Sequence, residues 1–169
     1  MLSLMESHHL DYSRTFRLLS QYKGTTSPDF DKFLDKFAPK TQVPVHLHGD
    51  YRSDWKAWFE KYETRLQESE SQAGASKPED RKARIAAANP RFILRQWVLE
   101  EAIARLRKDN DIAFLQKVLD MATKPFEEYG EELVGEDELA CPSPEIMEQR
   151  RLCDIGPTDM VGFQCSCSS

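Results

Sequence analysis

The chain has 169 residues, of which 31% are charged and 40% hydrophobic, and this length is typical of a single domain. It contains no run of about 18 apolar residues, and its first ten residues lack the basic start and apolar stretch of a signal peptide, so we expect no membrane partner and no secretory leader. The net charge of −6 argues against bulk binding to nucleic acid.

Residues 1–66 are predicted to form a helical segment. Side chains at steps of three and four predict a first helix, with a stripe made of Met5, His9, Tyr12, Phe16 and Leu19. Gly24 to Pro28 interrupts this pattern. A second, shorter stripe ends before Pro39 and consists of Phe30, Phe33, Leu34 and Phe37.

The next residues predict an extended link and a third helix. Pro44 restricts Val43, so residues 43–45 are expected to be extended. Asp50 or Ser53 is suited to cap the helix that follows. Its inner face is predicted to contain Trp55, Trp58, Phe59, Tyr62 and Leu66. All three stripes indicate hydrophobic core more than a cofactor site.

A polar, small-residue stretch predicts a mobile loop over residues 67–80. A basic helix is expected from Pro78 to Ala88. Asn89 and Pro90 then resemble an N-cap and a first helical residue, so a new helix is predicted to run from Pro90 to about Lys108.

The helix predicted over 90–108 has apolar residues in two sectors, which is typical of a helix packed between two neighbours. Arg95 lies within one sector, and Trp97 lies within the other. A charge in that position needs a partner, since a buried unpaired charge costs several kcal/mol. Two interpretations stay open for Arg95: a side chain that reaches the solvent at the rim, or a specific interdomain contact.

A further helix is predicted from Asp111 to Ala122, ending before Pro125. Its inward residues are predicted to be Ile112, Leu115, Val118, Leu119 and Ala122. Residues 81–126 are therefore interpreted as a helical hairpin region.

Residues 127–169 are interpreted as an irregular acidic loop and a flexible, cysteine-containing tail. Nine acidic and no basic residues lie between Lys124 and Arg150, interrupted by Gly130, Gly135, Pro142 and Pro144. A solvated spacer and a docking site for a basic partner are both open here. The cysteines are Cys141, Cys153, Cys165 and Cys167. Their clustering does not suit a disulfide framework, and their spacing lacks the Cys-x-x-Cys pair of a zinc site.

No recognisable active site follows from the residues alone. Gly130 and Gly135 have the spacing of a phosphate-binding loop, but Glu136 and Asp137 stand where Lys and Ser or Thr are needed. The four histidines, which include the pair His46 and His48, are interpreted as ordinary polar residues.

Four segments together resemble the selenoprotein O (SelO, YdiU) family. Asp11-Tyr12-Ser13-Arg14-Thr15-Phe16-Arg17-Leu18-Leu19 is similar to the Asp-Tyr-Thr/Ser…Phe-Arg-x-Leu helix of the family. Asn89-Pro90-Arg91-Phe92-Ile93-Leu94-Arg95-Gln96-Trp97 resembles its Asn-Pro-x-x-x-Leu-Arg-Asn stretch, with Gln96 in place of the usual Asn. Lys124-Pro125-Phe126 and the terminal Cys167-Ser168-Ser169 match two further family segments. Nearly the whole chain therefore looks like the carboxyl-terminal part of such a protein.

The resemblance implies an all-α carboxyl-terminal lobe of a kinase-like enzyme. Such an enzyme transfers AMP from ATP to hydroxyl side chains of proteins, with magnesium or manganese. The nucleotide-binding residues of the family lie outside the matched region, so no catalytic, cofactor-binding or metal-binding residue is carried over to this chain. Its expected partners are the missing kinase-like core and, through that core, protein substrates. Eukaryotic members of the family are typically mitochondrial.

One functional position does carry over from the family. Cys167 stands where family members have cysteine or selenocysteine, which implies a redox switch that pairs with a cysteine of the catalytic core. Cys165 is the candidate resolving thiol. We expect the chain to support the core through the helix at 90–108, with Arg95 and Trp97 as interdomain contacts. The alternative is a free-standing helical module that binds other proteins.

Overall fold

In the computed structural model, residues 1–73, 78–130 and 142–157 are described, as are all their side chains except those of residues 70–73, 78 and 79. Eight α-helices and two short 3₁₀ helices make up this part of the chain, and it contains no strand, so the all-α prediction is confirmed. No helix among the described residues has the length and apolarity needed to cross a bilayer. The chain divides into two compact units, unit 1 up to residue 89 and unit 2 from residue 90 onward among the described residues.

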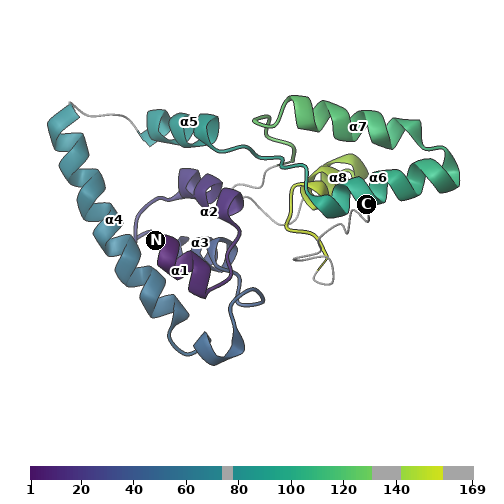
Figure 1. The fold of residues 1–169 in the computed structure, drawn as a ribbon. Coiled ribbons are helices and arrows are strands. Elements are labelled where there is room, and N and C mark those ends of the chain that lie inside the picture. The colour runs from purple at the N-terminus through teal and green to yellow at the C-terminus, as the bar shows by residue number, and fades with distance from the viewer. Residues whose placement is uncertain (74–77, 131–141, 158–169) are drawn as a thin grey trace, which may run out of the picture. The chain divides into compact units, whose positions relative to one another are not determined.

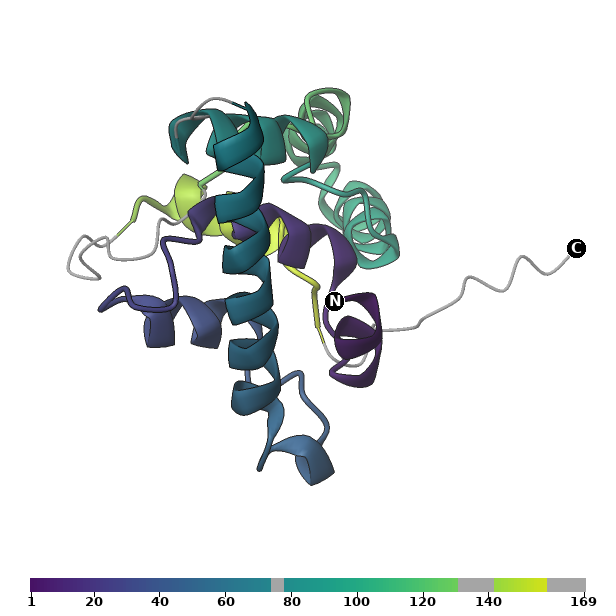
Figure 2. The same ribbon diagram turned by 90° about the vertical axis from the view of Figure 1, so that its left-hand side faces the viewer.

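Unit 1 contains five α-helices and the two 3₁₀ helices (Figure 1). In chain order they are α1 (Leu2–Ser7), α2 (Tyr12–Leu18), η1 (Leu19–Gln21), α3 (Phe30–Phe37), η2 (Val45–Leu47), α4 (Tyr51–Ala73) and α5 (Pro78–Ala88). Figure 2 shows α4 as the longest helix of this unit. The bounds of α3 and α5 confirm the helices predicted there.

The single helix predicted from Met5 to Leu19 is wrong, because the chain breaks between α1 and α2. His9 adopts a left-handed conformation with φ of 54°, which ends α1. Asp11 then caps α2, since its carboxylate accepts a hydrogen bond from the Arg14 amide at 2.9 Å. Tyr12, placed on the predicted inner stripe, is 59% exposed as a result.

An aromatic cluster forms the core of unit 1, as the second and third stripes predict. Phe37, Trp55 and Phe59 are fully buried, and the ring of Phe37 lies 5.0 Å from that of Trp55 and 5.1 Å from that of Phe59. Tyr22 stacks on Phe59 at 4.9 Å. Edge-to-face and offset contacts of this kind add about 0.5–1.5 kcal/mol per pair beyond the burial of apolar area.

The connection from α4 to α5 is shorter than the sequence predicts. α4 extends to Ala73, so residues 67–73 are helical where a loop is predicted. Gln67, Glu68 and Ser69 favour helix as readily as loop, and α4 is already nucleated by the buried residues before them.

Unit 2 consists of α6 (Gln96–Asp109), α7 (Ile112–Thr123) and α8 (Pro144–Leu152). α6 and α7 lie side by side as an antiparallel pair (Figures 1 and 2). Asp111 caps α7 by accepting a hydrogen bond from the Phe114 amide at 3.0 Å. The core of the unit contains Phe92, Trp97, Val98, Ala102, Phe114, Val118, Met121, Leu152 and Cys153.

Two predictions in this region are wrong. The helix predicted to start at Pro90 starts at Gln96, because the amides of Arg91 and Phe92 both donate to the Pro125 carbonyl, at 2.7 and 3.0 Å. The second difference is α8, which occupies residues 144–152 of the segment interpreted as an irregular loop. Ser143 caps it and Pro144 is its first residue, so this proline begins a helix instead of breaking one.

Candidate functional site

Two of the segments that carry the family resemblance, residues 11–19 and 89–97, meet at the end of α5. Arg17 is only 3% exposed, and its guanidinium donates to the carbonyls of Ala86 and Asn89 at 3.1 and 2.9 Å. These carbonyls belong to the last turn of α5 and the residue after it, where helical C=O groups lack intrahelical partners. Arg17 therefore stabilises the carboxyl end of α5, and its charge is compensated by that end of the helix dipole.

Other residues of the same segments also make structural contacts. Arg14 donates to the Lys36 carbonyl at 2.9 Å, after the turn that Asp11 caps. The Asn89 side chain donates to the Ile85 carbonyl at 2.8 Å, so Asn89 ends α5 and does not begin the next helix. In unit 2, Pro125 holds residues 91 and 92 through its carbonyl. Motif residues thus join segments distant in sequence within each unit.

Arg95 and Trp97, the predicted interdomain contacts, lie at the start of α6. Arg95 is half-buried and precedes the helix with extended backbone, where its carbonyl accepts from the Val98 and Leu99 amides at 3.1 and 3.3 Å. Trp97 is 6% exposed. Gly156 lies so close to its indole that a Cβ there would come within 2.2 Å of Nε1.

A charged network covers one side of the α6–α7 pair. Glu101 accepts hydrogen bonds from Arg105 at 2.6 Å and from Arg151 of α8 at 2.7 and 2.9 Å. Burial by itself raises the pKa of Glu101, but the hydrogen bonds from Arg151 and Arg105 outweigh it and lower the pKa below its usual range. Lys117 of α7 pairs with Glu148 of α8. These contacts place α8 on the side of Glu101 and Lys117.

The opposite side of the α6–α7 pair is apolar and exposed. At about 100° per residue, the exposed aliphatic residues of each helix point well away from the side that meets α8. We call them the aliphatic face: Leu99, Ile103 and Leu106 of α6, and Ile112, Leu115 and Leu119 of α7. Their exposed fractions range from 38% to 60%.

The aliphatic face differs from the sequence prediction for α7. Val118 is buried as predicted, but Ile112, Leu115 and Leu119, also predicted to point inward, are exposed, and Phe114 and Met121 are buried instead. The prediction is wrong for these three residues because α7 is apolar on two sides, and periodicity alone does not say which side is buried. The same two-sided composition was the available signal for a second contact surface.

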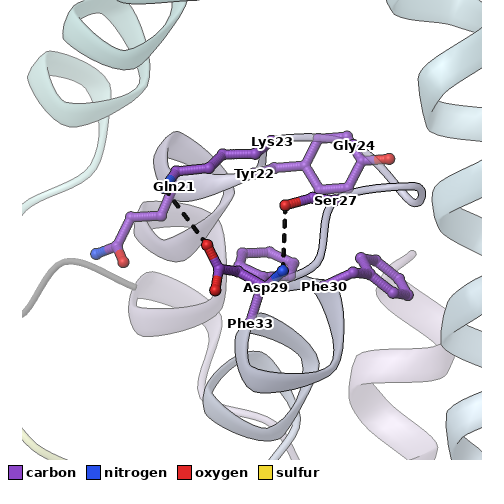
Figure 3. Close-up of a pocket in the computed structure, with 8 residues that line it drawn as sticks. All are labelled: Gln21, Tyr22, Lys23, Gly24, Ser27, Asp29, Phe30 and Phe33. Atoms are coloured by element: carbon purple, nitrogen blue, oxygen red, sulfur yellow. Dashed lines mark hydrogen bonds and ion pairs between the residues drawn. The ribbon is translucent and has the colours of Figure 1, made fainter. Parts of the chain in front are cut away.

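A small cavity lies beside the Gly24 turn in unit 1 (Figure 3). Tyr22, Phe30 and Phe33 contribute its aromatic walls. At its edge the Lys23 ammonium lies 3.9 Å from the Asp29 carboxylate, and the Asp29 amide donates to the Ser27 hydroxyl at 3.3 Å. Its free volume of about 10 Å³ is roughly that of one water molecule and far below that of a nucleotide site.

Glu63 of α4 fixes the turn beside this cavity. Its carboxylate accepts hydrogen bonds from the Thr25 hydroxyl at 2.7 Å and from the Tyr22 hydroxyl at 3.4 Å. Burial and the neighbouring Glu63 charge raise the pKa of Tyr22 well above its usual range, so this phenol stays protonated and donates. Gly24, with φ of 115°, brings the backbone close to the same carboxylate. The arrangement orders a turn and offers no proton-transfer group.

His8 is the histidine with the most unusual surroundings. It is 2% exposed, its Nε2 lies 3.9 Å from an Asp54 carboxylate oxygen, and its Nδ1 has no hydrogen-bond partner among the described residues. Burial lowers its pKa, and the attraction of Asp54 offsets this only in part. His48 contacts the Val43 carbonyl at 2.8 Å. Among the described residues, no three His, Cys, Asp or Glu side chains come together in a way that could hold a metal ion.

The predicted redox residues, Cys165 and Cys167, lie outside the described residues, as does Cys141. Cys153 is buried in the core of unit 2 as a thiol.

Comparison with known proteins identifies related sequences along most of the chain. The profile of a family described as protein adenylyltransferase SelO matches residues 1–123. A protein nucleotidyltransferase YdiU of Yersinia pseudotuberculosis is 32% identical over 147 residues, which cover 86% of this chain and 25% of the relative. Proteins of the same name from Cronobacter sakazakii and Myxococcus xanthus are each 30% identical, over 75% and 74% of this chain.

This chain spans about a quarter of the length of those relatives. No solved structure matches it.

Proposed function

This chain belongs to the SelO family of protein adenylyltransferases, and on that premise we propose that it is the carboxyl-terminal region of an enzyme that transfers AMP from ATP to protein hydroxyl groups. The observation that carries the proposal is the family match over residues 1–123, supported by relatives named as protein nucleotidyltransferases. Since the chain covers a quarter of such relatives, the proposal assigns it one part of the enzyme and not the whole.

We propose that the role of this part is structural. The motif residues Arg17, Asn89 and Pro125 are engaged in contacts that hold helices and loops in place. The cavity beside Gly24 is too small for ATP. Nucleotide and magnesium or manganese would therefore be held by residues that this chain does not contain, and the chemistry of transfer would occur there.

The contact with the kinase-like core is assigned to the segment before α6. The Pro125 carbonyl holds this segment at residues 91 and 92, which leaves Leu94 42% exposed and Arg95 at the helix start. Trp97, packed against Gly156, would fix the position of the segment instead of touching the core itself. Such an arrangement suits one apolar and one charged contact at the edge of an interface.

The tail is assigned the redox role that the family resemblance implies. A peroxide, reduced to water, would oxidise Cys167 and a thiol of the catalytic core to a mixed disulfide. Cys165 would then attack this disulfide at the Cys167 sulfur, forming a Cys165–Cys167 disulfide and releasing the core thiol. This assignment rests on the resemblance alone. Mass spectrometry of the assembled enzyme after oxidation tests it: if Cys167 stays a thiol while other cysteines pair, the assignment is wrong.

Nucleotide binding and transfer by the chain test the main proposal. We expect no ATP binding by calorimetry and no AMP transfer to a protein acceptor by the chain alone. Addition of the chain to a YdiU relative that lacks its own corresponding region is expected to restore transfer. A higher concentration of the Arg95→Ala variant than of the wild-type chain should be needed to restore the same rate of transfer. The Lys108→Ala variant, changed at an exposed position of α6, should restore transfer at the wild-type concentration. Tight ATP binding by the 169-residue chain would contradict the structural role.

A second candidate, a free-standing helical interaction module, is favoured by one observation. The aliphatic face presents six large side chains to solvent, and exposed apolar patches of this extent commonly mark contact surfaces.

A further inference from the structure

We propose that the aliphatic face joins two copies of this chain in a symmetric dimer, with α6 of one copy antiparallel to α6 of the other. This inference concerns the chain by itself and does not depend on AMP transfer. Three observations carry it: the extent of the exposed apolar surface, the position of that surface relative to α8, and the charges along its edge.

The first observation is the amount of apolar surface. Six aliphatic side chains with exposed fractions of 38% to 60% together present roughly 400–500 Å², which is within the range for the largest apolar patch of a monomer, a patch that is often functional. Two copies face to face would bury about 1,000 Å², which is near the lower limit of a specific interface. The expected dimer is therefore weak and dependent on concentration.

The second observation is that the face is open. α8 contacts α6 and α7 through the pairs Glu101–Arg151 and Lys117–Glu148, which lie on the other side of both helices. The aliphatic residues are spaced by four and three in α6 and by three and four in α7. Each helix thus offers one continuous stripe, the pattern with which helices pack against one another in antiparallel bundles.

The third observation is a pair of opposite charges beside the α6 stripe. Glu100 and Arg107 are seven residues apart, so they lie on the same edge of the helix, about 10 Å from each other along its axis. Arg107 is exposed and Glu100 is half-buried. When a second α6 runs antiparallel about a two-fold axis near Ile103, each Glu100 comes opposite the partner's Arg107. In a parallel pair about a two-fold axis, these residues of the two copies would lie on opposite edges of the interface, where they would not pair.

The experiment measures self-association of the full chain by sedimentation equilibrium from about 1 to 500 µM, the range in which an interface of this size is expected to titrate. We expect a monomer–dimer equilibrium. Ile103→Glu should weaken it about tenfold or more, because it buries a charge at the centre of the face. Met147→Glu is the matched control, since Met147 is 55% exposed on α8 and should not take part.

Charge exchange tests the antiparallel arrangement. Glu100→Arg and Arg107→Glu should each weaken the dimer, while the double variant should restore it, because the opposite charges then meet again with their positions exchanged. Circular dichroism establishes that each variant is folded.

Three results would overturn the proposal. The first is a wild-type chain that stays monomeric over the whole concentration range. The second is a dimer whose association Ile103→Glu and Met147→Glu weaken equally. The third is a double charge variant that associates as weakly as the two single variants. The outcome is independent of the transfer assay, in which Arg95 and not the aliphatic face is varied. If the chain formed the dimer and also bound ATP tightly, the proposed structural role would be refuted and the dimer proposal would stand.

Discussion

His8 is a single buried side chain that we expect to make the stability of unit 1 depend on pH. The imidazole is enclosed beside the rings of Tyr51 and Trp55, at centroid distances of 6.4 and 6.0 Å, and no residue that the structure describes forms a hydrogen bond with its Nδ1. Burial lowers its pKa from 6.5, and Asp54 raises it by a smaller amount. The unfolded chain therefore binds the proton more readily than the folded chain does.

The expected consequence is a loss of stability in mild acid. Well above pH 6.5 the imidazole is neutral in both states, and its ionisation contributes nothing to the free energy of unfolding. As the pH falls below 6.5, that free energy should decrease until the lower pKa of the folded state is passed. His8→Gln should remove this dependence, measured by urea unfolding at pH 5.5 and 7.5. His46→Gln, at an exposed site, should keep it, and equal profiles for the two variants would contradict the explanation.

Gly156 is a second residue whose identity is fixed by its surroundings. Its φ of 92° disfavours side chains, and a Cβ would lie 2.2 Å from Nε1 and 2.4 Å from Cδ1 of Trp97. Gly156→Ala should lower the free energy of unfolding of unit 2 by about 2–4 kcal/mol, through backbone strain and displacement of the indole. Thermal unfolding followed by circular dichroism measures this. Gly49→Ala, where nothing lies within 4 Å, should change the melting temperature little.

At the scale of elements, the sequence predicts a helix correctly where the residues that determine its position all lie within the helix itself. α3 has one apolar stripe, and all four residues of that stripe, Phe30, Phe33, Leu34 and Phe37, are buried. The break between α1 and α2 depends on one left-handed residue and one cap, and a continuous stripe of residues conceals both. The start of α6 depends on the Pro125 carbonyl, which accepts from the amides of residues 91 and 92, more than thirty residues away, and no local pattern contains this contact.

The sequence of α8 contains two opposing signals, because the acidic, glycine- and proline-containing composition around it favours a loop, whereas its capping residues favour a helix. Its Ser143-Pro144-Glu145 start is a strong helix signal, with a hydroxyl that accepts from the Ile146 amide, a proline at the first position and an acidic first turn. Arg150 and Arg151 in its last turn suit the other end of the helix dipole.

The cap of α8 is expected to be measurable. Ser143→Ala should lower the free energy of unfolding of unit 2 by about 1 kcal/mol, because the Ile146 amide loses its acceptor. Ser143→Asp, which keeps an acceptor at the same position, should retain wild-type stability. Urea unfolding at neutral pH compares the two, and equal losses would show that the cap does not contribute.

At the scale of the whole molecule, the described residues form two separate hydrophobic cores. Phe37, Trp55 and Phe59 lie at the centre of one, and Phe114, Val118 and Met121 belong to the other, with no residue shared. Because cavity formation acts on the residues that line it, damage to one core should be felt mainly within its own unit.

Matched core substitutions test this separation. Phe114→Ala should cost about 3–5 kcal/mol and increase amide hydrogen exchange in α6, α7 and α8. Phe37→Ala should have a similar cost and increase exchange in α3 and α4 instead. Hydrogen exchange followed by mass spectrometry resolves the two patterns. If either variant increased exchange equally throughout the chain, the units would behave as one cooperative structure.

The candidate site was predictable only in part, for the same reason as the fold. Local motifs identified the family, but the Arg17–Asn89 contact joins residues 72 positions apart and appears only in three dimensions. The aliphatic face was hidden because a two-sided helix does not reveal which side is covered. The roles of Cys165 and Cys167 stay predictions, since both lie outside the described residues.

The packing of Trp97 on Gly156 also provides an optical signal. Of the three tryptophans in the chain, Trp55 and Trp58 belong to α4, so Trp97 is the single indole of unit 2. Trp97 belongs to α6, the helix that also contains Leu99 and Ile103, and its ring centroid lies 5.5 Å from the guanidinium of Arg151 in α8. The difference in fluorescence emission between the wild-type chain and Trp97→Phe therefore reports on this unit alone, without an attached dye.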